Sequence, residues 1–172
     1  MTRTRDEYHA LRRRYQPASV SLAIVAESPP KSGKYFYDAT GQVSEPLYSA
    51  LMKILGEAPA TKEAGLCAFR DRGWVLVDAT YEPVNGLSDP ERDAVILRDR
   101  PRLVADLKQL AAGQPMPVVL LKANVCALLD AFLTEQGVTV LNRGRPVYFP
   151  SNGRQRQFHT QFTDIVGGAG LL

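Results

Sequence analysis

Apolar residues gather in three short runs that are separated by longer, mixed segments. The runs are SVSLAIVA (19–26), WVLVDA (74–79) and PVVLLKA (117–123), and each is almost wholly apolar. Runs of this length that do not alternate with polar residues are typical of strands buried on both faces of a parallel sheet. The sequence therefore predicts three strands at the centre of the fold.

The segments between these runs predict helices, because their apolar residues recur at helical spacing and residues suited to helix ends flank them. Pro101 lies inside one of these segments and predicts a break or kink near Arg100. The short stretches 138–141 and 146–149 are candidates for further strands. The predicted helices cover about 3–15, 44–55, 61–72, 89–112, 124–136 and the segment from 153 onward.

Strands that alternate with helices in this way predict an α/β protein. We expect one domain over residues 1–172, with three α/β/α layers and a central, mainly parallel four-stranded sheet. A chain of this length is large enough to bury such a core.

Composition narrows the class of protein without identifying it. The chain is 45% hydrophobic and 23% charged, which is ordinary for a globular protein, and no apolar run approaches the ~20 residues of a membrane span. The charged N-terminus lacks a signal core, and Cys67 and Cys126 have no metal-ligand spacing. We therefore expect a cytoplasmic monomer without a membrane segment, metal or cofactor. The net charge of +3 permits contact with nucleic acid but does not by itself argue for it.

Polar side chains follow each of the three predicted strands. Glu27 follows the first, Asp78 closes the second, and Lys122 and Asn124 follow the third. Ligands of parallel sheets bind beyond the carboxyl ends of the strands, so these side chains are expected to share a site. The first loop also carries three consecutive aromatic residues, 35–37, which suit a pocket for something flat and polar.

A fourth loop, FPSNGRQRQ (149–157), leads into the last predicted helix. Its backbone N–H groups at Asn152 and Gly153, together with the helix dipole, favour an anion there. Carboxylates, an aromatic platform and an anion-binding turn are what cleavage of a bond to a planar leaving group needs.

Four motifs along the chain resemble, in their order, the motifs of the uracil-DNA glycosylase superfamily. AESPP (26–30) is similar to its first motif, with Gly33 and Phe36 where the family has a glycine and then a phenylalanine that stacks on flipped uracil. The resemblance covers roughly residues 19–165, and it is closest to a bacterial glycosylase-like branch with an E-S-P-P motif. The other three motifs are VLVDATYEPVN (75–85), LLKANVCALL (120–129) and YFPSNGRQRQF (148–158).

The chain departs from the family pattern at three points. It lacks the four cysteines of the iron–sulphur branch, so no cluster is expected. Asp78 stands where the family has a uracil-reading asparagine, and Phe149 replaces a histidine that polarises the uracil carbonyl. The resemblance implies a uracil-DNA glycosylase-like fold and hydrolysis of an N-glycosidic bond after base flipping.

Three residues are candidates for catalysis. Glu27 can orient the attacking water and stabilise the cationic sugar; its alternative is to cap its loop or pair with Lys31 or Lys34. Asp78 can accept the uracil N3–H but repels O4 unless it is protonated or paired; it can also share water activation or cap the next turn. Asn152 can supply the donor that is missing at Phe149.

The remaining candidates contact the base or the DNA. Phe36 would stack on the extruded base, although at least one of the three aromatic residues must anchor the loop. Asn124 has the alternative role of a helix N-cap. The base-binding set is Phe36, Ser28, Pro29, Tyr37, Asn85 and Asn124, and the DNA-binding set is Pro150, Ser151, Gly153, Arg154, Gln155 and Arg156.

These residues predict a monofunctional DNA repair enzyme that excises uracil, or another damaged base, from DNA. Two alternatives stay open. One is a catalytically weak or inactive module of the same fold that binds damaged or single-stranded nucleic acid. The other is a hydrolase of free nucleosides, which would have no affinity for DNA.

Overall fold

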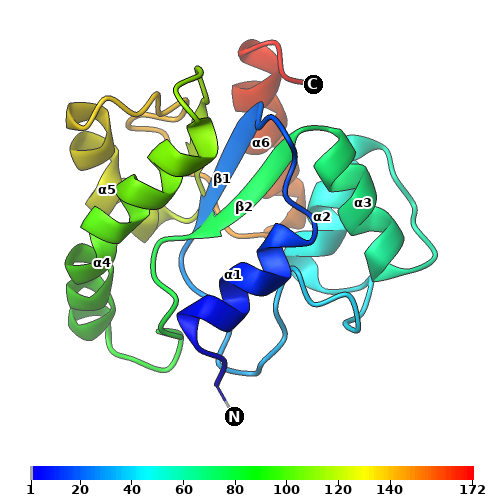
Figure 1. Ribbon diagram of the computed structural model, residues 1–172, viewed down its shortest axis with the longest axis horizontal. Helices are drawn as coiled ribbons and strands as arrows, with labels where there is room; N and C mark the ends of the chain where they lie inside the picture. Colours follow the sequence, from blue (N-terminus) through cyan, green and yellow to red (C-terminus); the bar gives the residue numbers. More distant parts are fainter. Residues whose placement is uncertain (1) are drawn as a thin grey trace.

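Three parallel strands form the centre of the molecule in the computed structural model, which describes residues 2–172. The strands are β1 (Leu22–Ala26), β2 (Trp74–Asp78) and β3 (Val118–Leu120), in the order β2-β1-β3. Every residue in them is buried, as the apolar runs predicted. Ala26 pairs with Asp78 and Val25 with Leu120, so the three carboxyl ends lie at one edge of the sheet. Figure 1 shows β1 and β2 side by side.

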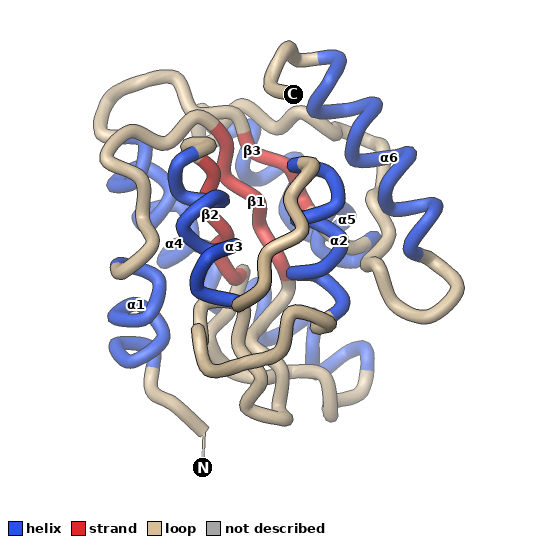
Figure 2. Tube along the Cα trace, turned by 90° about the vertical axis from the view of Figure 1, so that its right-hand side faces the viewer, coloured by secondary structure: helices blue, strands red, loops and turns tan. Residues whose placement is uncertain are grey.

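Six helices accompany the sheet within residues 2–172, and five of them cover its two faces. Leu22 and Ile24 of β1 point into a core shared with α2, α3 and α6, whereas Ala23 and Val25 point into one shared with α4 and α5. Three layers therefore form, as predicted (Figure 2). The helices are α1 (Arg5–Arg13), α2 (Pro46–Leu55), α3 (Lys62–Asp71), α4 (Asp89–Ala111), α5 (Ala123–Glu135) and α6 (Gln155–Gly168).

Side-chain caps fix where several helices begin. Thr4 and Glu7 form a capping box at α1, Thr61 caps α3, and Ser88 with Glu91 caps α4. Glu45 occupies the cap position of α2, one residue after the predicted start of this helix at residue 44. Among residues 2–172, no helix has both the length and the apolar content that crossing a bilayer requires.

The predicted fourth strand is wrong. Residues 138–141 contribute one isolated bridge, Val118 to Val140, and residues 146–149 form no strand. The reason is that the Asn142 side chain takes the place of a strand: its amide donates to the Leu120 carbonyl at 2.8 Å and accepts from the Leu120 N–H at 2.9 Å. The Val147 carbonyl then accepts from the Lys122 N–H at 2.7 Å. Separate side-chain and loop groups, in place of a strand, therefore satisfy the backbone hydrogen bonds at the edge of β3.

Of the break or kink predicted near Arg100, the break is wrong, because α4 runs through Pro101 without interruption. Pro101 is exposed, while Ile96, Leu103 and Leu107 on the other side of the helix pack into the core against the sheet. The packing of this apolar face outweighs the one backbone hydrogen bond that a proline removes.

A buried ion pair fastens α1 to α4. The Arg12 guanidinium donates to both carboxylate oxygens of Asp106 at 2.7 Å, and also to the Tyr81 hydroxyl at 3.0 Å. Both charged side chains are less than 8% exposed. The pair therefore fixes α1 beside the loop that follows β2.

We expect Asp106→Ala to lower the free energy of unfolding by about 3–5 kcal/mol, because it leaves the Arg12 charge buried without its partner. Urea denaturation measures this loss. Asp164→Ala, on the exposed side of α6, is the matched control and should change stability by less than about 0.5 kcal/mol. Equal stability of the two variants would show that the buried pair does not hold α1 in place.

Candidate functional site

A cavity of about 500 Å³ opens at the carboxyl ends of the three strands, and we call it the main cavity. Its walls come from segments far apart in the sequence. The walls include Asp78, which ends β2, and Glu27, which directly follows β1. The rest of the loop after β1 and the loop before α6 complete them. The lining is Ala26, Glu27, Ser28, Pro29, Pro30, Ser32, Lys34, Tyr35, Phe36, Glu45, Pro46, Leu47, Tyr48, Leu76, Asp78, Asn85, Lys122, Phe149 and Ser151.

Glu27 is held by three donors from two other elements. Lys122 Nζ donates to Oε1 at 2.8 Å, Arg92 donates to the same oxygen at 3.3 Å, and the Asn124 amide donates to Oε2. Glu27 is only 8% exposed. Neither Lys31 nor Lys34 is its partner, so the carboxylate is fixed by charges that α4 and the start of α5 bring to it.

Lys122 occupies an uncommon backbone conformation at this junction. Its φ angle is 88°, a left-handed value that costs free energy in any residue other than glycine. Lys122, and not Asn124, takes the cap position of α5, so the N-cap role considered for Asn124 is wrong. This turn places the Lys122 and Asn124 side chains against Glu27. The two hydrogen bonds that they donate to its carboxylate offset the backbone strain.

A buried lysine of α3, Lys62, anchors the aromatic loop after β1. Lys62 Nζ donates to the Tyr35 carbonyl at 2.7 Å and to the Glu45 carboxylate at 2.6 Å. Phe36 lines the main cavity and packs edge-on against Tyr37 and Phe69. Its ring is therefore fixed in the wall before any ligand arrives.

Tyr37 does not line the cavity, which corrects its predicted role in binding. Its side chain is wholly buried, and its hydroxyl accepts a hydrogen bond from the Leu76 N–H at 2.7 Å. Tyr37 is thus the aromatic residue that anchors the loop to β2. Tyr35 lines the cavity, although it was not among the predicted binding residues.

Two residues that line the main cavity each carry a buried polar atom without a hydrogen-bond partner within residues 2–172. The atoms are Asp78 Oδ2 and the Tyr35 hydroxyl oxygen. Burial raises the pKa of Asp78 to about 7, and the nearby Arg12 charge only partly opposes this. Burial, and then the negative charge of Asp78, raise the pKa of Tyr35 well above its usual range.

The predicted residues Ser28, Pro29 and Asn85 lie together in the main cavity. Ser28 Oγ accepts from the Val84 N–H at 3.3 Å, and Asn85 Oδ1 accepts from the Lys31 N–H at 2.9 Å. These contacts tie the loop after β1 to the loop after β2. The Asn85 amide nitrogen keeps its two donors for a ligand.

A second depression, of about 450 Å³, adjoins the main cavity, and we call it the basic groove. It shares Lys122, Phe149 and Ser151 with the main cavity. Arg154 lies in it, with its guanidinium 4.5 Å from the centre of the Tyr148 ring. The groove is lined by Asp89, Arg92, Asp93, Lys122, Ala123, Asn124, Tyr148, Phe149, Ser151 and Arg154.

The remaining residues of the predicted DNA-binding loop line neither depression. Asn152 and Gly153 are exposed, so the structure does not bring the predicted Asn152 to Glu27. Gln155 and Arg156 are exposed on the first turn of α6, whereas Pro150 is buried. Of this loop, Ser151 and Arg154 are therefore the predicted residues that reach the site.

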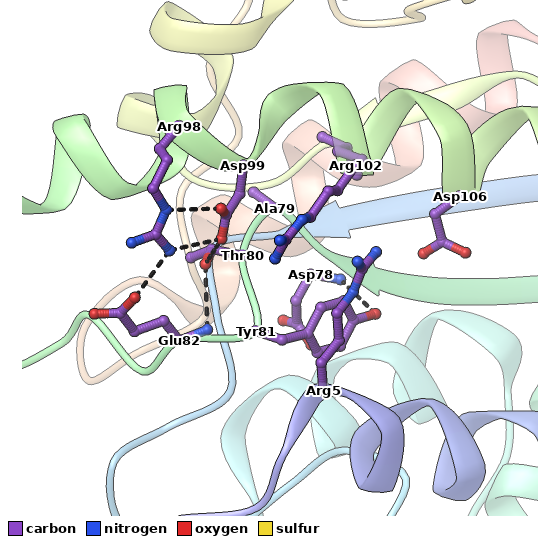
Figure 3. Close-up of a pocket in the computed structure, with 11 residues that line it drawn as sticks. Arg5, Asp78, Ala79, Thr80, Tyr81, Glu82, Arg98, Asp99, Arg102 and Asp106 are labelled. Carbon is purple, nitrogen blue, oxygen red and sulfur yellow. Dashed lines mark hydrogen bonds and ion pairs between the residues drawn. The ribbon is translucent and has the colours of Figure 1, made fainter.

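A smaller cavity of about 210 Å³ lies on the far side of Asp78, at the edge of β2. Figure 3 shows Arg5 of α1 and Arg102 of α4 reaching toward Tyr81 and Asp78. Arg98, also on α4, forms ion pairs with Asp99 and Glu82. These three side chains form the outer wall of the smaller cavity. Asp78 thus separates this edge cavity from the main cavity.

Sequence analysis missed Arg92 because it lies in the first turn of a predicted helix, with no motif around it. Only the packing of α4 beside β1 shows that it reaches Glu27. Lys122 was noted at the end of a strand, but its distance to Glu27 depends on the strand order. Across residues 2–172, no group of three or more His, Cys, Asp or Glu side chains is placed to hold a metal ion.

We expect Asp78→Asn to flatten the dependence of stability on pH. In the folded chain the raised pKa keeps a proton on Asp78 up to about pH 7, whereas the ordinary pKa of 3.8 releases it far lower. The folded state therefore binds more protons between these values, and the contribution of Asp78 to stability falls as pH rises through that window, on the order of 4 kcal/mol at most.

Urea denaturation of wild type and Asp78→Asn at about pH 5 and about pH 8 measures this effect. The variant should gain stability relative to wild type at the higher pH. Asp164→Asn, an exposed residue on α6, should follow wild type at both. An Asp78→Asn variant whose stability runs parallel to wild type would show that Asp78 is ionised throughout.

Comparisons of the chain with protein-family models, with curated proteins and with solved structures found no match. The geometry of the main cavity and the basic groove, together with the motif resemblance, is what a functional proposal has to explain.

Proposed function

We propose that the protein is a uracil-DNA glycosylase-like enzyme that hydrolyses the N-glycosidic bond of uracil, or a related damaged base, in DNA. One observation carries this proposal. A largely apolar cavity adjoins a basic groove, and Lys122, which lines both, donates a hydrogen bond to Glu27 in the wall of the cavity. A flipped nucleotide has this same order of parts: a flat base, a sugar and a phosphate.

The main cavity suits the base. Phe36, Leu47 and Tyr48 contribute apolar walls, and Asn85 contributes donors near the mouth. Stacking of a base on an aromatic ring is worth about 1–3 kcal/mol, and the prior anchoring of Phe36 removes the cost of ordering the ring.

Glu27 suits the activation of water. A carboxylate has about four lone-pair positions, and three donors already bind Glu27: Lys122, Arg92 and Asn124. The remaining position, on Oε2, can accept a proton of the attacking water. The negative charge of Glu27 also favours the cationic sugar that develops as the glycosidic bond breaks.

Lys122 suits stabilisation of the departing base. Its ammonium group has three N–H donors, and the structure shows one of them bound, to Glu27. Because Lys122 also lines the main cavity beside Phe149, the free donors can meet negative charge on the base. Lys122 then supplies what Phe149, which has no polar group, does not.

The basic groove suits the phosphates that flank the flipped nucleotide. Arg154 lies in the groove without an acidic partner within residues 2–172. Arg92 lies deeper, between Glu27 and Asp89. The DNA backbone would therefore follow the groove, with the sugar at Glu27.

We expect the protein to excise uracil from an oligonucleotide carrying a single uracil, and Glu27→Gln to slow excision by about 10²–10⁴-fold. The variant keeps the shape of the side chain but removes its negative charge. Excision is measured as alkali-sensitive cleavage of end-labelled strands, single-stranded and paired with guanine or adenine. Glu57→Gln, an exposed residue after α2, is the matched control and should leave the rate unchanged.

Absence of cleavage on every substrate would overturn the enzymatic proposal. Binding to DNA without cleavage would then indicate a recognition module. Release of uracil from free nucleosides, with no binding to DNA, would indicate a nucleoside hydrolase.

We expect Arg154→Gln to weaken binding to uracil-containing DNA and to reduce the slope of log K against log salt concentration by about 1. The variant removes one cation from the basic groove. Fluorescence anisotropy over a salt series measures the slope. Lys108→Gln removes the same charge at the last turn of α4, and unchanged slopes in both variants would place the DNA elsewhere.

A further inference from the structure

Two arginines from different helices line the edge cavity without an acidic partner. Arg5 comes from α1 and Arg102 from α4, and Figure 3 shows both side chains reaching toward Tyr81 and Asp78. The Arg5 guanidinium lies 5.9 Å from the centre of the Tyr81 ring. The ion pairs formed among residues 2–172 include neither arginine. Two cationic groups that share a cavity and lack acidic partners favour an anion there.

The carboxylates that line the same cavity are already bound by other arginines. Both oxygens of Asp106 accept from Arg12 at 2.7 Å. Arg98 pairs with Asp99 at 2.8 Å and with Glu82 at 2.9 Å. These three acids therefore have their charge balanced, in large part, without Arg5 or Arg102.

The remaining carboxyl group of the edge cavity, Asp78, opposes an anion only weakly. It is 3% exposed, and burial raises its pKa to about 7, so it is partly protonated near neutral pH. Around the cavity, four arginines then meet three ion-paired carboxylates, and the excess positive charge lies with Arg5 and Arg102.

The edge cavity has room for one small anion. Its volume of about 210 Å³ is less than half that of the main cavity, about 500 Å³. Arg5 and Arg102 also line an outer depression of about 290 Å³, together with Asp6 and His9. Asp6 is exposed, so solvent and salt screen its charge. A ligand can therefore place an anionic end in the edge cavity and extend through the outer depression.

We propose that Arg5 and Arg102 form a binding site for a phosphate group that carries two negative charges. A guanidinium presents its N–H donors in a planar fork that matches two phosphate oxygens, and α1 and α4 bring the two forks to one cavity (Figure 3). The buried pair of Arg12 and Asp106 fixes these helices beside each other, so the two forks are positioned before a ligand arrives. Two cations attract a dianion more strongly than an anion with a single charge.

This phosphate site is separate from the proposed enzymatic site. Glu27, Lys122 and Arg154 line the main cavity or the basic groove, and none of them lines the edge cavity. Its existence therefore does not depend on the proposed function. The phosphate group belongs either to a small phosphate monoester or to the terminal phosphate of a nucleic-acid strand, because both carry the same dianion.

Titration with inorganic phosphate at constant ionic strength, followed by the amide chemical shifts of the protein, tests the site. We expect saturable binding, with the largest shifts in residues 79–82 and in the turns of α1 and α4 that face them. Acetate, which carries a single charge, should bind at least about tenfold more weakly. No saturable binding of phosphate at millimolar concentration, or the largest shifts in residues 151–154, would overturn the proposal.

Single substitutions test the two arginines. Arg5→Gln and Arg102→Gln should each weaken phosphate binding by about tenfold or more, because each removes charge-assisted hydrogen bonds. Arg13→Gln on α1 and Lys108→Gln on α4 remove the same charge from exposed positions that line neither depression, and they are the matched controls. The controls should keep the affinity within about twofold. Equal losses in all four variants would show that phosphate responds only to net charge, and the proposal would fall.

Longer ligands identify the source of the phosphate. Tighter binding of an oligonucleotide with a terminal phosphate than of the same strand with a terminal hydroxyl, lost in Arg102→Gln but kept in Arg154→Gln, would assign the site to a strand end. Equal binding of the two strands, with a nucleoside monophosphate bound in an Arg102-dependent way, would assign it to a small monoester. If Arg102→Gln binds each of these ligands as wild type does, the site does not exist.

Discussion

Parallel pairing of β1 with β2 and β3 is the constraint on which the site depends. Ala26 lies opposite Asp78, and the Leu121 N–H donates to the Val25 carbonyl at 2.8 Å. All three strands are buried on both faces, so a slip in register would leave backbone groups unpaired in a dry interior. The pairing therefore delivers Glu27, Asp78 and Lys122 to one edge of the sheet.

The two carboxyl groups at that edge meet opposite environments. Lys122, Arg92 and Asn124 bind the Glu27 oxygens, whereas Asp78 has an oxygen without any partner within residues 2–172, and burial raises its pKa to about 7. Because the two carboxyl groups have different environments, one site can contain a charged carboxylate and a neutral carboxylic acid together. In the proposed enzyme, Glu27 is the charged group, and it acts on the sugar and the attacking water.

The site is also held by contacts that lie outside it. Lys62 fastens the aromatic loop from α3, and Asn142 closes the open edge of β3 with its side chain. Arg12 and Asp106 fix α1 beside Tyr81, which borders the edge cavity behind Asp78. The cavity walls are thus positioned by buried polar contacts as well as by the apolar core.

The sequence by itself determined the three central strands, their alternation with helices and the placement of Glu27, Asp78 and Lys122 at strand ends. It could do so because apolar runs and helix caps are local signals that burial reinforces. The pattern of residues 138–149 wrongly suggested a fourth strand, since nothing local shows that Asn142 bonds to Leu120. Only the tertiary structure decided that Arg92 reaches Glu27, that Tyr37 lies in the core while Tyr35 faces the cavity, and that Asn152 stays outside. Each of these placements depends on which distant segments of the chain pack together, and no local pattern in the sequence indicates that packing.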